Sequence, residues 1–208
     1  MARYRGPVCR MCRVEREKLF LKGERCFTSK CAIERREGTP GQHGKKRSKF
    51  SEYKTQLREK QKVKRIYGLG EKQFRANFVK SAKTKGVTGT EMLLSLERRL
   101  DNMVYRIGFG TSRNHSRQVV KHGMVLVNGK RVNIPSYKVS VGDVIEIREK
   151  SKTGIALKAA MEFAQSRSIP EWITLDREAM RGTVNALPSR EQLTQPINEQ
   201  LIVELYSK

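Results

Sequence analysis

The chain has 208 residues, and its 44 Lys and Arg against 21 Asp and Glu give a formal net charge of +23 at pH 7. With only 37% hydrophobic residues, this balance is far from that of an ordinary soluble enzyme and predicts a polyanionic partner such as nucleic acid. The apolar runs are much shorter than the roughly 20 residues that span a bilayer, and no apolar signal segment follows the basic N-terminus. We therefore expect a soluble intracellular protein with reduced thiols and no membrane partner.

The positive charge is unevenly placed along the chain. Residues 151–208 contain seven basic and seven acidic residues, so residues 1–150 carry the whole excess. Positive charge confined to one part of a chain indicates a nucleic-acid contact surface.

All four cysteines lie between residues 9 and 31, in the spacing C-x₂-C-x₁₃-C-x₄-C. Two close pairs joined by a short loop can supply the thiolates of a tetrahedral zinc site, so we predict a structural Zn²⁺ held by Cys9, Cys12, Cys26 and Cys31. Nearby basic side chains are expected to favour the thiolate form, namely Arg10, Arg13, Arg25 and Lys30.

Other interpretations of these cysteines stay open. The same four thiolates can hold an iron–sulfur cluster, and His43 could replace one of them as a ligand. The thiols could also be ordinary core residues or disulfides, whereas a thioredoxin-like pair is disfavoured because no βαβ pattern surrounds it.

Residues 36–49 are rich in glycine and lysine and predict a basic extended loop. The phosphate-loop pattern is not met, because Thr39 stands where Gly44-Lys45 would require a glycine. A basic arm of this composition is typical of segments that lie along a phosphate backbone.

Helices are predicted next. Ser51 caps a basic helix that stops at Gly68, and residues 71–86 form a second helix with a phenylalanine-rich face. Thr88 then begins, with a capping box, one long apolar helix that continues to Gly108. We expect the apolar stripes of these helices to form a core.

Residues 111–147 predict a further helix followed by strands. Ser112 can cap a short helix with a basic row that consists of Arg113, Arg117 and Lys121. Asn128-Gly129 is a strong hairpin signal between two strands.

Further strands are indicated where Tyr137 to Val141 alternate and over residues 144–147. The predicted fold class is therefore α+β. It combines a helical N-terminal domain and its metal-binding arm with a helix pair packed on a small antiparallel sheet.

The neutral segment 151–208 is expected to contact protein rather than phosphate. A helix is predicted from Ile155 to Phe163, and a strand from Leu201 to Leu205, where apolar residues alternate.

Several segments resemble one family. Residues 98–147, from RRLDNMVYRIGF through SRNHSRQVVKHGMVLVNGKRV to PSYKVSVGDVIEI, resemble the RNA-binding module named after bacterial small-subunit ribosomal protein four. The resemblance covers nearly the whole chain, because RYRGPVCRMCR, KGERC, PGQHG, LREKQKVKRIYG and INEQLIVELYSK are also similar to that family. Some members lack the cysteines, and this sequence resembles the cysteine-bearing form.

The resemblance implies a structural component of the small ribosomal subunit. Such a protein is a primary binder of the 5′ domain of small-subunit (16S) rRNA, nucleates assembly and contributes to translational accuracy. Implied partners are this rRNA, small-subunit ribosomal protein five, other small-subunit proteins and, as in some relatives, its own mRNA. The implied domains are a metal-binding basic arm (1–50), a helical domain (51–97, joined by a C-terminal strand, 197–208) and a second domain (98–196) with an RNA-binding core (98–150).

Charge pattern and resemblance together predict direct RNA contacts in both parts of the chain. The candidates are Arg3, Arg5, Arg10, Arg13, Arg47, Lys62, Arg65, Arg113, Arg117, Gln118, Lys121 and Lys130. Aromatic residues make up only 7% of the chain, which favours recognition of RNA shape over base stacking.

No catalytic residues are predicted. The same module is appended to pseudouridine synthases, and Arg99-Leu100-Asp101 superficially resembles their catalytic stretch, but the remaining segments are too small for a catalytic domain. Nucleophile-elbow and H-E-x-x-H patterns are missing, so neither an enzyme nor a small-molecule substrate is expected. A DNA-binding helix-turn-helix is the other alternative, because charge does not distinguish DNA from RNA.

Overall fold

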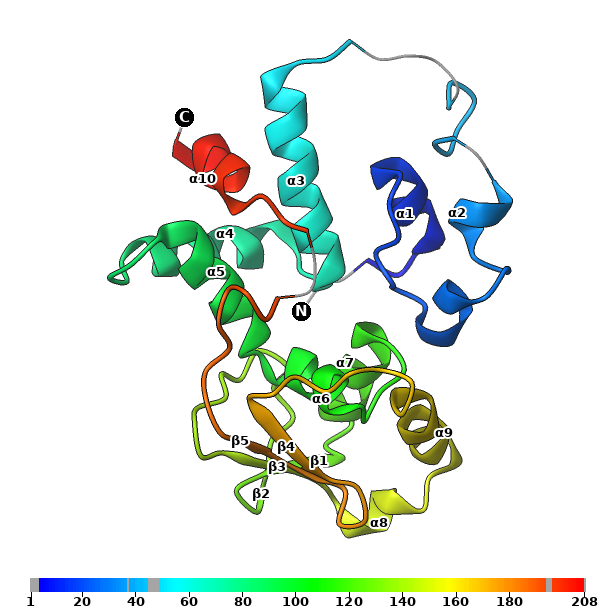
Figure 1. Cartoon of the computed structure of the whole chain (residues 1–208), viewed down its shortest axis with the longest axis vertical. Helices are drawn as coiled ribbons and strands as arrows, with labels where there is room; N and C mark the ends of the chain where they lie inside the picture. Colours follow the sequence, from blue (N-terminus) through cyan, green and yellow to red (C-terminus); the bar gives the residue numbers. More distant parts are fainter. Residues whose placement is uncertain (1–3, 37, 45–48, 194–195, 208) are drawn as a thin grey trace. The chain divides into compact units, whose positions relative to one another are not determined.

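The computed structural model describes residues 4–36, 38–44, 49–193 and 196–207. The chain forms two compact units, residues 1–93 with 195–208 and residues 94–194 (Figure 1). The domain boundaries predicted from the sequence stay a prediction. No helix in the described ranges is both long and apolar enough to cross a membrane.

The first unit is helical. Its N-terminal arm contains α1 (Cys9–Glu15), the 3₁₀ helix η1 (Gly23–Phe27) and α2 (Ala32–Arg35). Longer helices follow: α3 (Glu52–Ile66), α4 (Glu71–Ala82) and, from the far end of the chain, α10 (Glu199–Ser207). A further helix, α5 (Thr88–Glu97), begins in this unit and ends in the second one.

The cap signals of the sequence are confirmed at both ends of α3. Ser51 Oγ accepts a hydrogen bond from the Lys54 N–H at 3.2 Å, as an N-cap side chain does. Gly68, beyond the other end, has a φ of +62°, a conformation that favours glycine. The inner face of α3 contributes Val63 and Ile66 to the core of this unit.

The C-terminal segment is a helix, so the strand predicted there is wrong. α10 packs against α3 (Figure 1), with Ile202 fully buried. Tyr206, one helical turn later, places its ring 4.6 Å from that of Phe78 on α4. The apolar residues recur with helical as well as strand-like spacing, and the apolar surface offered by α3 and α4 selects the helix.

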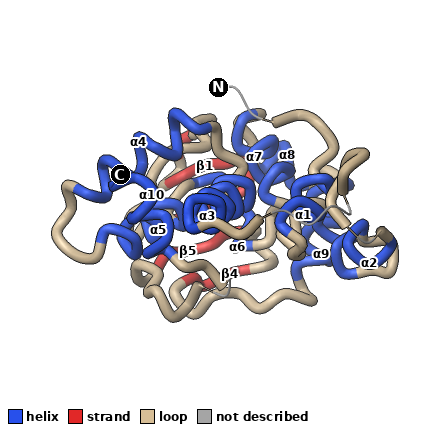
Figure 2. The backbone as a smooth tube through the Cα atoms, turned by 90° about the horizontal axis from the view of Figure 1, so that it is seen from above, coloured by secondary structure: helices blue, strands red, loops and turns tan. Residues whose placement is uncertain are grey.

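The second unit confirms the α+β class, because a helix pair packs on an antiparallel sheet. The pair consists of α6 (Leu100–Ile107) and α7 (Arg113–Lys121), while α8 (Glu149–Lys152) and α9 (Ile155–Ala164) follow the third strand. The five-stranded sheet has the order β2-β1-β3-β5-β4, and Figure 2 shows its strands in red. Its strands are β1 (Val125–Val127), β2 (Lys130–Arg131), β3 (Val144–Ile147), β4 (Ile173–Asp176) and β5 (Arg181–Val184).

The sheet is larger than predicted, because β4 and β5 come from the neutral segment 151–208. Gly182 in β5 lies directly under α6, where an added Cβ would be 2.8 Å from Ile107 Cδ1. Glycine therefore permits the close approach of helix and sheet. A glycine in a short strand also weakens the sequence signal for that strand.

The Asn128-Gly129 turn between β1 and β2 is confirmed. Both residues have positive φ, 50° and 75°, as a type I′ turn requires. Asn128 also fixes the start of β3, because its Nδ2 donates to Asp143 Oδ1 at 2.8 Å and its Oδ1 accepts from the Val144 N–H at 2.9 Å.

The prediction of one long apolar helix is wrong, because α5 and α6 are separate. Arg99, between them, is extended, with φ −69° and ψ 137°. Peptide groups at the break bond to another segment: the Leu100 N–H donates to Tyr137 O at 2.8 Å, and the Val139 N–H donates to Arg98 O at 2.9 Å. This partner segment, predicted as a strand, forms only an isolated bridge. Apolar spacing continues through the break and therefore hides it in the sequence.

Candidate nucleic-acid interface and metal centre

A buried carboxylate near the start of α6 holds two arginines. Asp101 is 5% exposed and accepts hydrogen bonds from Arg99 at 3.0 and 2.8 Å and from Arg117 at 2.7 Å. Both arginines are buried as well. The three side chains join the helix break, α6 and α7, and they leave an excess of buried positive charge.

A second buried carboxylate, Glu97, orients a predicted contact residue. Its two oxygens each accept from Arg106 at 2.9 Å, and one also accepts from the Asn102 amide at 2.7 Å. The amide oxygen of Asn102 accepts in turn from Arg113 Nε at 2.8 Å. Glu97 and Asn102 are not among the predicted site residues. The sequence could have indicated them, because each is a polar residue at a core position of a predicted apolar helix.

The basic row predicted on α7 is only partly exposed. Gln118 and Lys121 are exposed, Arg113 is half-buried, and Arg117 is turned inward to Asp101. Lys130, on β2, is exposed. Regular spacing along α7 cannot reveal that a carboxylate from the preceding helix holds the central arginine.

In the first unit, carboxylates of the N-terminal arm pair with basic residues of α3. Lys62 is 9% exposed and lies 2.8 Å from Glu17 Oε2. Arg65 pairs with Glu15, whose side chain is 3% exposed. Burial raises the pKa of Glu15, although the charges of Arg58 and Arg65 act against it. Lys62 and Arg65, both predicted RNA contacts, thus fasten the arm to α3.

A further carboxylate, Glu71, joins the start of α4 to α3. Lys60 Nζ lies 2.7 Å and Lys64 Nζ 2.8 Å from its oxygens. Although burial acts in the opposite direction, the hydrogen bonds from these lysines lower the pKa of Glu71 to about 2. Glu71 therefore stays ionised near neutral pH.

The arginines of the arm that were predicted to contact RNA differ in their exposure and in their hydrogen bonds. Arg5 and Arg10 are exposed, whereas Arg13 Nε donates to Gly38 O at 3.2 Å and ties the loop after α2 to α1. Arg3 and Arg47 lie outside the described residues. In the predicted basic loop, residues 38–44 and 49–50 belong to no helix or strand.

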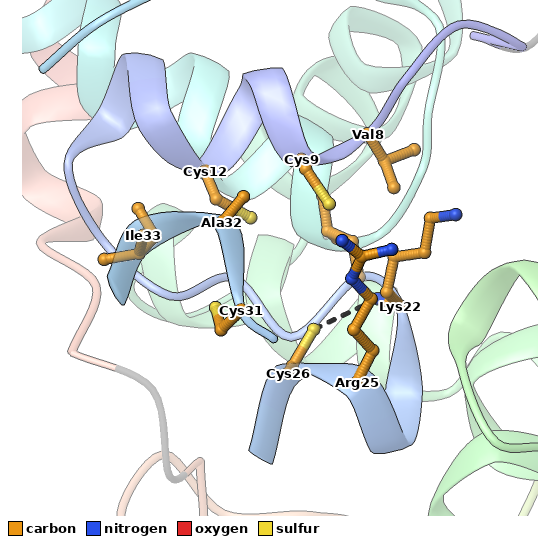
Figure 3. Close-up of a pocket in the computed structure, with 10 residues that line it drawn as sticks. Val8, Cys9, Cys12, Lys22, Arg25, Cys26, Cys31, Ala32 and Ile33 are labelled. Carbon is orange, nitrogen blue, oxygen red and sulfur yellow. Dashed lines mark hydrogen bonds between the residues drawn. The ribbon is translucent and has the colours of Figure 1, made fainter. Parts of the chain in front are cut away.

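The four cysteines meet in the arm. α1 carries Cys9 and Cys12, η1 carries Cys26, and Cys31 immediately precedes α2. All four line one cavity of about 10 Å³ (Figure 3), and all four thiols are free. His43 is exposed and does not line this cavity.

Burial is the largest influence on the pKa of two of the cysteines, Cys12 and Cys26. It raises the pKa of Cys12 to about 11, and the neighbouring cysteines add to the effect although a backbone hydrogen bond with Leu19 opposes it. Burial also raises the pKa of Cys26. At Cys26 the effect of burial on the pKa outweighs that of the positive neighbour Lys18, and the expected influence of the nearby basic side chains stays a prediction.

The donor chemistry of the cavity suits a metal such as zinc, which prefers thiolates. Within the described ranges, however, no group of three or more His, Cys, Asp or Glu side chains is arranged as a formed metal site. The structure brings the predicted ligands to one cavity, and the metal stays a prediction.

The exposed cations on α7 and β2, together with those of the basic arm, indicate a nucleic-acid-binding protein. Residues 3–97 match the ribosomal protein S4/S9 N-terminal domain, and residues 98–145 match the S4 domain. The chain therefore belongs to the ribosomal protein S4 family, as the resemblance of its motifs predicts.

Full-length relatives support this assignment. The chain is 58% identical to "Small ribosomal subunit protein uS4" of Desulfatibacillum aliphaticivorans and 59% identical to the protein of that name in Pelobacter propionicus. It is also 59% identical to the protein of the same name in Syntrophotalea carbinolica. Each match covers 100% of both chains.

Asp101→Asn should lower the free energy of unfolding by about 3–5 kcal/mol, because Arg99 and Arg117 would be buried without their counter-ion. Urea unfolding followed by circular dichroism measures the change. Glu149→Gln is the matched control, because its pair with Lys152 is exposed and its loss should have a much smaller effect. Similar small changes in the two variants would contradict the structural role of Asp101.

Proposed function

We propose that the protein is a structural component of the small ribosomal subunit that binds small-subunit rRNA. The observation that carries this function is the full-length identity of 58–59% to proteins named small ribosomal subunit protein uS4. Membership of a family of structural ribosomal proteins also agrees with the predicted lack of enzymatic activity. The protein acts in the ribosome, in the cytoplasm.

RNA affinity comes from exposed cations that neutralise phosphates and release counterions. Lys121 and Lys130 serve this role in the S4 domain, with Gln118 as a neutral hydrogen-bonding group, and Arg5 and Arg10 serve it in the arm. The buried ion pairs keep α6 and α7 rigid. A rigid charged surface suits the recognition of RNA shape, which is how folded RNA is generally distinguished.

We further propose that the target is the 5′ domain of 16S rRNA, and that the protein binds it early and nucleates assembly. The motifs of the arm and of the module support this target by family resemblance. A surface that is ordered by internal ion pairs suits a primary binder, because it needs no other protein to shape it. A contribution to translational accuracy belongs to the same proposal, as does binding of its own mRNA.

We propose that Cys9, Cys12, Cys26 and Cys31 hold one structural zinc ion. Their spacing, their free thiols and their shared cavity support this site. The bound ion would cross-link α1, η1 and the start of α2, and so would shape the arm that carries Arg5 and Arg10. An iron–sulfur cluster is the alternative for the same four donors.

Small-subunit ribosomal protein five is the proposed protein neighbour, and the neutral segment 151–208 is the proposed contact. A segment with balanced charge is suited to protein rather than to phosphate. It also exposes apolar side chains, with Ile155 at 87% and Leu187 at 48%.

Replacing Lys121 and Lys130 together by Gln should weaken binding to a 5′-domain rRNA fragment. The slope of log affinity against log salt should fall by roughly 0.7–0.9 for each phosphate that is no longer neutralised. Filter binding over a salt series measures both effects, with Lys158→Gln on α9 as the control. An unchanged slope would exclude these two lysines as phosphate ligands, and a preference of the native protein for duplex DNA would exclude the rRNA function. The protein's own mRNA is tested as a competitor.

Protein purified anaerobically without added metal should contain one zinc per chain and show no visible absorption. Elemental analysis and absorption spectroscopy measure this. Cys9→Ser should lose the metal, loosen the arm and weaken rRNA binding without abolishing it. Iron with a broad visible band would identify a cluster instead, and four titratable thiols with neither metal would rule out the site.

Charge reversal in the neutral segment should weaken pairwise binding to small-subunit ribosomal protein five severalfold and alter misreading. Glu162→Lys and Glu171→Lys change exposed residues of this segment, and Glu149→Lys is an exposed control outside it. Pairwise titration and a misreading reporter give the two readouts. If neither readout moves, this segment is not the interface.

A further inference from the structure

Two guanidinium groups meet on one aromatic ring in the second unit. Tyr105 lies on α6, and its ring centre is 4.6 Å from Arg113 Cζ and 4.5 Å from Arg167 Cζ. Arg167, which follows α9, also lies 5.3 Å from the ring centre of Phe163. A single ring thus holds two positive charges close together, although they come from segments far apart in the sequence.

Each of the two arginines donates a hydrogen bond to a neutral oxygen. Arg113 Nε donates to Asn102 Oδ1 at 2.8 Å, and Arg167 Nη2 donates to the backbone oxygen of Gly110 at 3.2 Å. Arg167 Nε is buried without a hydrogen-bond acceptor in the described part of the chain. Among the described residues, no carboxylate pairs with Arg167, so stacking rather than an ion pair fixes its position.

Two buried carboxylates of this unit hold other arginines. Asp101 is shared by Arg99 and Arg117, and Glu97 holds Arg106. The region therefore keeps an excess of positive charge. A guanidinium that stacks on a ring by its face keeps its N–H groups directed sideways, where its terminal nitrogens can donate to a phosphate oxygen.

We propose that Arg113 and Arg167, held on Tyr105, form a phosphate clamp for folded RNA. The clamp rests on the proposed rRNA function and extends it beyond residue 145, where the S4 domain match ends. Arg167 brings a phosphate contact from the segment 151–208, whose balanced charge predicts only protein contacts. The ligand is the RNA backbone, so the contact adds affinity without reading bases.

The test is binding of the full-length protein to a 5′-domain rRNA fragment over a salt series. Arg167→Gln should weaken binding roughly tenfold and lower the salt slope by about 0.7–0.9. Lys158→Gln removes an exposed charge from α9 and should leave affinity and slope unchanged. Tyr105→Phe keeps the ring and should bind like the native protein, whereas Tyr105→Leu should weaken binding more than Arg167→Gln does, because both arginines lose their support.

A folded Arg167→Gln variant with native affinity and slope would overturn the clamp and leave the proposed function standing. Failure of the native protein to prefer this rRNA would overturn both. Should Arg167→Gln not fold, the native protein is treated with a dicarbonyl reagent that modifies arginine. Protection of Arg167 by the rRNA fragment supports the clamp, and equal modification with and without the fragment overturns it.

Discussion

At several places in this fold, two cationic side chains share a single carboxylate. Asp101 holds Arg99 and Arg117, Glu15 lies against Arg58 and Arg65, and Glu71 holds Lys60 and Lys64. A chain with twice as many basic as acidic residues cannot give each cation its own counter-ion. Sharing lets a few carboxylates fasten helices together and leaves most of the positive charge for the surface.

The shared pairs also separate two kinds of arginine. Those that reach a buried carboxylate lose most of their exposure and keep the helices in place, as Arg117 does. Arg167, by contrast, has a neutral oxygen and aromatic rings as its neighbours and no carboxylate partner among the described residues. A buried ion pair is often no more stabilising than an apolar substitute. The value of the pairs here is that they hold a charged surface in one shape.

Local signals predicted much of the fold correctly. The Ser51 and Ser112 caps and the Asn128-Gly129 turn depend on neighbouring residues only, and the structure has all of them. The helix break at Arg99 and the helical C-terminus depend on distant partners. The break is stabilised by bonds to residues 135–139, and α10 by the surface of α3. Neither partner can be read from the segment itself.

The candidate sites also combine features that local sequence predicts with features that depend on distant residues. Sequence spacing indicated four cysteines that the structure brings to one cavity. It could not separate exposed Lys121 from buried Arg117, since both occupy the same row of α7 and only a carboxylate on α6 distinguishes them. The sequence of the neutral segment did not mark Arg167 as a candidate RNA contact. Its position depends on the ring of Tyr105, which lies more than 60 residues earlier in the chain.

The Asn128-Gly129 turn carries a chemical weakness along with its structural role. Asparagine is a thermolabile residue, and hydrolysis of its amide would turn Asn128 into an aspartate. The donor that now contacts Asp143 at 2.8 Å would become a second negative charge, so attraction between the turn and β3 would change to repulsion. The new charge would also stand two residues from exposed Lys130. Ageing of one side chain would therefore loosen the sheet and repel RNA phosphate at the same point.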